Sequence, residues 1–232
     1  SASCTWEYPA AAPTWLEIPE DQSAEFLLPF RYDVNATIPG NLSLWWVNDT
    51  ARFSIDQNGV ITNGTHLPIG IFPLHIYVND TWGQRIDSAI QVIVQDTLPP
   101  AWVSHPEDQA IELGDDLNYD LDAYDLSGIA GWWISDMENF SIDSSGTLRN
   151  EVDLVVGNYS LLVRVTDSYD RKLNATIRIT VQDTTPPIWS STPQNQTIAS
   201  GTPLSYQLVA SDLSPIVQWT INDTENFHID SS

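Results

Sequence analysis

The chain has 232 residues, of which 42% are hydrophobic and ten are tryptophan, so it can bury a core and is not disordered through charge. Its 31 acidic and 8 basic residues give a formal net charge of −23, which excludes nucleic acid and anionic membranes as partners and favours cations. No apolar run approaches the roughly 18 residues that span a bilayer, so we expect no membrane span in this segment.

Residues 1–12 read as an N-terminal tail that precedes the first folded repeat. The tail carries Cys4, the single cysteine of the chain, so no intramolecular disulfide can form. A free thiol, an intermolecular disulfide and a metal ligand stay open as roles for Cys4, and the metal ligand has no Cys or His neighbour to support it. Because the sequence starts at Ser1 rather than at Met, we expect a processed, secreted protein.

A constant spacing of 87 residues organises the rest of the chain, which aligns with itself without a gap. The aligned positions are Trp15, Trp102 and Trp189; Pro19, Pro106 and Pro193; Trp45, Trp132 and Trp219; Phe53, Phe140 and Phe227; and Asp56, Asp143 and Asp230. Proline pairs mark the boundaries, which predicts one repeat at 13–98, a second at 99–185 and an incomplete third at 186–232.

Within each repeat apolar and polar residues alternate, which is typical of strands and not of helices. In chain order the alternating segments are 30–36, 72–78 and 90–94, then 117–123, 159–165 and 177–181, and finally 204–210. Turn signals such as Asn58-Gly59 and Ser145-Gly146 separate them. The pattern predicts an all-β protein of tandem immunoglobulin-like β-sandwich repeats, with about seven strands in each.

The boundaries at Pro99-Pro100 and Pro186-Pro187 are stiff rather than flexible, because proline fixes φ and restricts the residue before it. We therefore expect the repeats to stand end to end as a rod. The third repeat lacks counterparts of segments 159–165 and 177–181. Two explanations stay open: the natural chain continues, or a neighbouring subunit donates strands to the incomplete repeat. The expected partners are accordingly further copies of this chain or other surface proteins.

Asn-x-Ser/Thr acceptors occur at ten of the fourteen asparagines. They are Asn35, Asn41, Asn48, Asn63, Asn79, Asn139, Asn158, Asn174, Asn195 and Asn222. About two or three would arise by chance, so the excess predicts a glycosylated, extracellular or cell-surface protein of a eukaryote or an archaeon.

Adjacent tryptophans occur in two repeats, and neighbours on a strand face opposite ways. The third repeat keeps Trp219 but follows it with Thr220, so the core members are predicted to be Trp45, Trp132 and Trp219. Trp46 and Trp133 are then the exposed rings. Packing against a loop or a glycan and binding of an external sugar both stay open for them.

The second half of the second repeat reads Phe140-Ser-Ile-Asp-Ser-Ser-Gly146, then Gly157-Asn-Tyr-Ser-Leu-Leu-Val-Arg-Val-Thr-Asp167, then Ile177-Arg-Ile-Thr-Val-Gln-Asp183. This order resembles the cadherin superfamily, and more closely its dystroglycan-type cadherin-like domains, over residues 13 to 232. Related immunoglobulin-like surface repeats use similar strand sequences.

The resemblance implies calcium at the boundaries between repeats. Residues that match the family's ligand positions are Glu20, Asp96, Asp125 and Asp167 for the first junction, and Glu107, Asp183 and Asp212 for the second. The sequence departs from the family where His66-Leu-Pro-Ile and Val152-Asp-Leu-Val replace the Leu-Asp-Arg-Glu motif, and the linker shortens to Asp-Thr before its prolines. Calcium and a solvated acidic seam both stay open.

Catalysis has little support, because the four histidines fall at non-equivalent positions without a nucleophile or metal-ligand spacing around them. We expect a non-catalytic, structural or adhesive extracellular protein, either a cell-surface stalk or a filament subunit. The alternative is a carbohydrate-binding ancillary module of a larger surface protein, which would present Trp46 and Trp133 to polysaccharide.

Overall fold

The computed structural model describes residues 11–37 and 42–230, so Cys4 and Asn41 lie outside the described residues. All regular elements of the described residues are strands, which confirms the predicted all-β fold. Within the same residues, no helix is long and apolar enough to cross a membrane.

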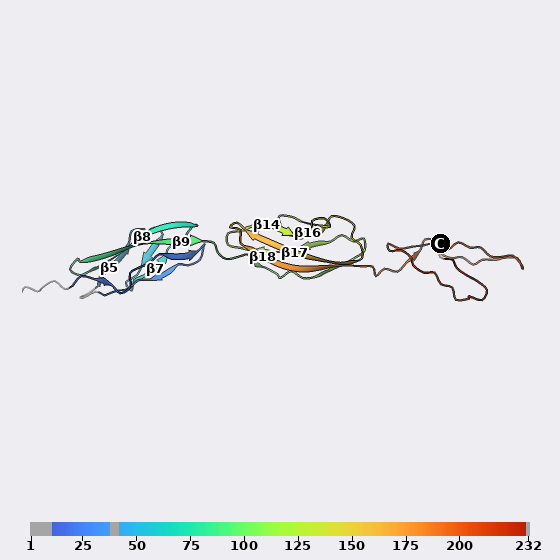
Figure 1. The fold of residues 1–232 in the computed structure, drawn as a ribbon, viewed down its shortest axis with the longest axis horizontal. Helices are drawn as coiled ribbons and strands as arrows, with labels where there is room; N and C mark the ends of the chain where they lie inside the picture. The colour runs from blue at the N-terminus through green and yellow to red at the C-terminus, as the bar shows by residue number, and fades with distance from the viewer. Residues whose placement is uncertain (1–10, 38–41, 231–232) are drawn as a thin grey trace, which may run out of the picture. The chain divides into compact units, whose positions relative to one another are not determined.

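The first sandwich pairs a four-stranded sheet with a three-stranded one (Figure 1). The larger sheet has the order β2 (Gln22–Glu25), β9 (Arg85–Gln95), β8 (Gly70–Asp80) and β5 (Leu42–Val47), with β2 parallel to β9 and the other pairs antiparallel. The smaller sheet has the order β3 (Arg31–Asp33), β7 (Val60–Asn63) and β6 (Phe53–Ile55). A short pair, β1 (Thr14–Trp15) and β4 (Ala36–Thr37), closes one end.

The second sandwich repeats this topology strand for strand. Its larger sheet has the order β11 (Gln109–Glu112), β18 (Lys172–Gln182), β17 (Gly157–Asp167) and β14 (Ile129–Ile134). The smaller sheet has the order β12 (Asn118–Asp120), β16 (Thr147–Asn150) and β15 (Phe140–Ile142), and the short pair is β10 (Ala101–Trp102) with β13 (Ala123–Tyr124). The predicted recurrence of one β unit is therefore confirmed for these two repeats.

Alternation along the long hairpin strands builds each core. On β8, Leu74, Ile76 and Val78 are buried, whereas His75 and Tyr77 between them face outward. Burying one such aliphatic side chain stabilises the fold by about 1.5–3 kcal/mol. Trp45, Trp132 and Trp219, the predicted core tryptophans, each lie 5.8 Å, centroid to centroid, from the tryptophan that opens their repeat. Trp45 is buried in the first core and Trp132 packs half-buried against the second, whereas Trp219 is half-buried in a segment without a core.

A tight turn connects β15 to β16 in the second sandwich. Asp143 accepts hydrogen bonds from the backbone N–H groups of Ser145 and Thr147, at 2.9 and 3.1 Å. Gly146 adopts φ = 92°, and its carbonyl accepts a bond from Leu121 N at 3.0 Å. Asp143 thus holds the turn between β15 and β16, and Gly146 connects that turn to the end of β12.

Acid is expected to weaken this turn. Hydrogen bonds from the Ser145 side chain, and then from Arg149, hold the pKa of Asp143 well below its ordinary value of 3.8. A depressed folded-state pKa means that the carboxylate contributes its stability in full above about pH 3.8 and loses it as the pH falls further. The difference in unfolding temperature between the parent chain and Asp143→Ala should therefore narrow from about pH 5 to about pH 2. A constant difference would contradict this assignment.

The third segment forms only the short pair β19 (Ile188–Trp189) and β20 (Ala210–Ser211) within the described residues. The predicted strand over 204–210 is thus mostly absent, and Leu204 and Tyr206 are 39% and 40% exposed. The physical reason is that the positions equivalent to β16, with which such a strand would pair, and to β17 and β18 of the opposite sheet fall beyond residue 232.

The chain divides into two compact units. The first comprises Ser1–Ala101 with Tyr124–Ala130 and Thr166–Lys172, and the second comprises Trp102–Ala123, Gly131–Val165 and Leu173–Ser232. Two turns that follow β13 and β17 in sequence thus belong to the first unit. One contact that holds the turn after β17 there joins the rings of Phe26 and Tyr169, whose centroids are 6.3 Å apart.

Candidate metal centre

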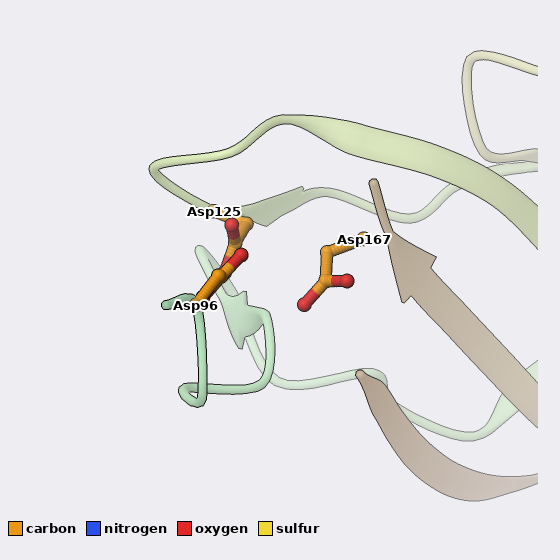
Figure 2. Close-up of side chains that lie close together, drawn as sticks. All are labelled: Asp96, Asp125 and Asp167. Atoms are coloured by element: carbon orange, nitrogen blue, oxygen red, sulfur yellow. The ribbon is translucent and has the colours of Figure 1, made fainter. Parts of the chain in front are cut away.

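Three aspartates converge in the first unit, each at the end of a strand. Asp96 follows β9, Asp125 follows β13, and Asp167 is the last residue of β17. Figure 2 shows their carboxylates facing one another, and one oxygen from each lies within 4.8 Å of the others. The strand ends bring together residues that are far apart in the sequence.

Backbone hydrogen bonds orient two of the three carboxylates. Asp167 Oδ1 accepts from the N–H groups of Tyr169 and Arg171, at 2.7 and 2.9 Å. Asp125 Oδ1 accepts from the N–H and the Oγ of Ser127, both at 2.7 Å. In Asp167 one oxygen therefore shapes the turn while the other is left to face the cluster.

The linker that carries Asp96 is held on two sides. On one side, Glu25 of β2 accepts from Thr97, whose N–H lies 2.8 Å and whose Oγ1 lies 2.6 Å from the two carboxylate oxygens. Burial raises the pKa of Glu25, but hydrogen bonds from Thr97, with smaller contributions from Leu98 and Asp96, together outweigh it and hold the pKa below its usual value. On the other side, Arg171 Nε donates to the Asp96 carbonyl at 3.1 Å.

Two of the cluster's oxygens are buried without a partner. Asp96 is 6% exposed and Asp167 is 1% exposed, and the Oδ2 atom of each accepts no hydrogen bond. A buried carboxylate oxygen without a donor is costly, and three neighbouring carboxylates repel one another as well. A cation among the carboxylates would offset both costs.

Calcium fits this donor set. Ca²⁺ binds oxygen ligands at about 2.3–2.6 Å, so two ligand atoms of one ion are at most about 5 Å apart, and one oxygen from each aspartate lies within 4.8 Å of the others. The set holds no nitrogen or sulfur ligand of the kind that zinc and copper sites use. Asp96, Asp125 and Asp167 would hold the ion, and backbone carbonyls and water would complete its six to eight oxygens.

The two predicted glutamate ligands do not join such a cluster. Glu20 is exposed, and its N–H donates to Tyr32 Oη at 3.1 Å. Glu107 makes the same backbone bond to Tyr119 Oη at 2.8 Å, and so does Gln194 to Tyr206 at 2.9 Å. Since the third repeat keeps the bond without an acidic side chain, the recurring role of this position is a backbone contact.

Asp183 and Asp212, predicted for the second junction, form no group of three acidic residues within the described part of the chain. A hydrogen bond from the Ser214 side chain, with help from Thr185, holds the pKa of Asp183 below its ordinary value. Asp212 accepts from Ser214 N at 3.2 Å. The position equivalent to Asp167 lies beyond residue 232, so a third carboxylate is not part of this sequence.

No protein-family model matches the chain, and no curated protein does. Similar solved structures are tandem immunoglobulin-like and cadherin domains. Titin domains Z1Z2 in complex with telethonin align over 77% of this chain and 100% of theirs, at 12% identity and a TM-score of 0.45. Drosophila N-cadherin EC1-4 aligns over 78% and 53%, at 15% identity and 0.34, and human mucin-like protocadherin EC1-2 over 74% and 98%, at 14% and 0.36.

Sequence reasoning missed the residues that hold the linker, Glu25 and Arg171, and it missed Asp80. Asp80 occupies the position of Asp167 in the first sandwich, and its Oδ1 likewise accepts from Trp82 N and Gln84 N, both at 2.9 Å. It is 1% exposed, and its Oδ2 has no hydrogen-bond partner. The repeat spacing would have found Asp80 and also Glu25, which aligns with Glu112, whereas no pattern marks Arg171.

The two tryptophans predicted to face outward lie on the outer faces of the larger sheets. Trp46 stacks on Tyr77, with ring centroids 4.9 Å apart and planes 10° apart. Trp133 is 37% exposed, and the Arg164 guanidinium lies over its ring, 5.0 Å from the centroid. Each ring thus packs against a neighbour on the adjacent strand.

The glycosylation acceptors divide into two groups in the described residues. Exposed acceptors are Asn35, Asn48, Asn158, Asn174, Asn195 and Asn222, and half-buried ones are Asn63, Asn79 and Asn139. Asn63 has a structural role as well, because its Oδ1 accepts from Phe30 N at 2.8 Å and its Nδ2 donates to Thr65 O. Asn150, which is not an acceptor, makes the same pair of bonds in the second sandwich.

Proposed function

We propose that the chain is a non-catalytic, extracellular structural or adhesive protein in which calcium fixes the linker that follows β9. The observation that carries this proposal is the convergence of Asp96, Asp125 and Asp167 with two buried carboxylate oxygens that lack donors. A bound calcium ion would supply the missing positive charge and tie the linker to the two turns that carry the other ligands. Sites of this kind in extracellular modules have dissociation constants of about 0.1–1 mM.

Hydrogen exchange of the full chain tests the calcium function directly. Calcium at millimolar concentration should slow the exchange of backbone amides near Asp96, Asp125 and Asp167, while amides in β15 and β16 serve as an internal control. The change should disappear in Asp96→Ala. Equal rates of exchange with calcium and with EDTA would show that calcium does not fix this linker.

The proposed protein is secreted and N-glycosylated. Support comes from the ten acceptors, six of which are exposed in the described residues. Peptide mass spectrometry of the protein from its natural source, or from a glycosylating host, should find sugar on several of the exposed acceptors. Unmodified peptides at every acceptor would end this part of the proposal.

The proposed roles are a surface stalk or a subunit of an extracellular filament, with copies of the chain or other surface proteins as partners. In the third segment exposed apolar residues such as Leu204 and Phe227 would be covered by further strands, either from a continuing chain or from a neighbouring subunit. Electron micrographs of purified material should show regular fibres if the chain polymerises. Polysaccharide binding that is lost in Trp46→Ala and Trp133→Ala would instead support an ancillary binding module.

A further inference from the structure

Three side chains form a row across the outer face of the larger sheet in the second sandwich. Trp133 comes from β14, Arg164 from β17 and Asn174 from β18, and these strands are neighbours in that order. The Arg164 guanidinium lies over the Trp133 ring at 5.0 Å, and Arg164 Nε donates to Asn174 Oδ1 at 3.0 Å. The arginine thus connects an aromatic ring to a glycosylation acceptor.

Arg164 fixes how the Asn174 amide is presented. A guanidinium only donates hydrogen bonds, so the amide atom that faces it must be the oxygen. The amide nitrogen Nδ2, which is the atom that carries an N-linked sugar, is therefore turned away from Arg164. Asn174 is exposed, and Thr176, which completes its acceptor sequence, is exposed on the same face.

Arg164 and Trp133 also have unused capacity for a ligand. Only one of the five guanidinium N–H groups takes part in a described hydrogen bond, and no acidic side chain of the described residues forms a salt bridge with Arg164. Trp133 as a residue remains 37% exposed. Free donors beside an exposed indole suit a sugar, which has hydroxyl acceptors on its edges and C–H groups on its faces.

We propose that the first sugars of an N-glycan on Asn174 lie over Arg164 and Trp133, so that the glycan is a packed part of the second sandwich. This inference rests on the N-glycosylation proposed above and adds the protein surface on which the Asn174 glycan packs. Sugar oxygens accept from the guanidinium, and a sugar face packs on the part of the indole that Arg164 leaves exposed. The occupant is a glycan of this same chain and not an external polysaccharide, because the acceptor asparagine belongs to the row.

The first sandwich lacks an equivalent surface for a glycan. Its aligned row is Trp46, Tyr77 and Asp87, so an aspartate replaces the acceptor asparagine and a tyrosine replaces the donor arginine. A useful reference is Asn158, another exposed acceptor on the same face as Asn174, whose Oδ1 accepts from Thr180 Oγ1 at 2.9 Å. It lies six residues from Arg164 along β17, about 20 Å away.

The test uses the full chain secreted from a eukaryotic host. Glycopeptide mass spectrometry first measures occupancy at Asn174 and Asn158, and a peptide-N-glycosidase then removes sugar from the folded protein. Trp133→Ala should speed release at Asn174 about fivefold, the factor expected for the loss of one aromatic contact, and should leave release at Asn158 unchanged. Arg164→Gln should have a similar effect, and Trp46→Ala should have none at either site.

Each contrary outcome is distinct. Sugar on Asn158 but not on Asn174 would overturn only the proposed packing of the Asn174 glycan. No sugar at any acceptor would overturn the proposal of a glycoprotein too. Unchanged release at Asn174 in both Trp133→Ala and Arg164→Gln would show that the glycan does not touch the row. Faster release at both Asn174 and Asn158 would show that the whole sheet has loosened, which also contradicts a specific contact between the Asn174 glycan and the row.

Discussion

Replacing Gly146 by alanine should lower the free energy of unfolding of the second sandwich by about 3 kcal/mol or more. A Cβ atom there would lie 2.4 Å from the Leu121 carbonyl oxygen and 2.9 Å from the Trp132 ring. The backbone φ of 92° is also one that residues with a Cβ rarely adopt. Leu121 cannot yield easily, because its N–H already bonds to the Gly146 carbonyl.

Thermal unfolding followed by near-ultraviolet circular dichroism measures this effect, and a loss of about 10 °C or more is expected for the second sandwich. Gly131→Ala is the matched control, because a Cβ at Gly131 would meet no atom within 4 Å. That control should shift the free energy of unfolding by less than about 1 kcal/mol. Equal shifts for the two variants would show that the turn is not held as described.

Asp167→Asn should stabilise the calcium-free protein by about 1 kcal/mol and should abolish its response to calcium. The asparagine keeps an Oδ1 that can accept from Tyr169 and Arg171, so the turn survives. Its amide N–H₂ replaces the buried Oδ2 and can donate to a neighbouring carboxylate, which relieves repulsion within the cluster. The parent chain, by contrast, should gain roughly 1.4 kcal/mol when free calcium is ten times the dissociation constant.

Unfolding temperatures in EDTA and in millimolar calcium compare the two proteins. Asp170→Asn provides the control. It removes the same negative charge at a position three residues after Asp167, and the Asp170 side chain does not belong to the aspartate cluster. Its φ of 64° is one that asparagine tolerates. Asp170→Asn should keep the full calcium response, and a response retained in Asp167→Asn would instead exclude this carboxylate as a ligand.

The repeat spacing predicts much of the fold because each repeat must bury the same faces. Alternation at 72–78 and 90–94 corresponds to β8 and β9, and Trp45 and Trp132 make the same ring contact in their two sandwiches. The same reasoning fails at 204–210, where alternation is present but the partner strands are not part of the sequence. Alternation shows that a segment can form a strand, and the strand still needs a sheet to join.

The candidate site was predictable in part. Similarity to a ligand motif identified Asp96, Asp125 and Asp167 as neighbours, but it assigned Glu20 to them as well. A motif position does not fix the direction of a side chain, and at Glu20 the backbone makes the recurring contact. The residues that hold the linker could not be read locally, since Arg171 is 75 residues from Asp96 and Glu25 is 72 residues from Thr97.

Isothermal titration of the full chain with calcium tests most directly whether the three aspartates form a metal site. The account predicts saturable binding with a dissociation constant of about 0.1–1 mM in the parent chain, and loss of that binding in Asp96→Ala and in Asp167→Asn. Heat that is the same for all three proteins, or no saturable binding in the parent chain, would show that the cluster holds no calcium.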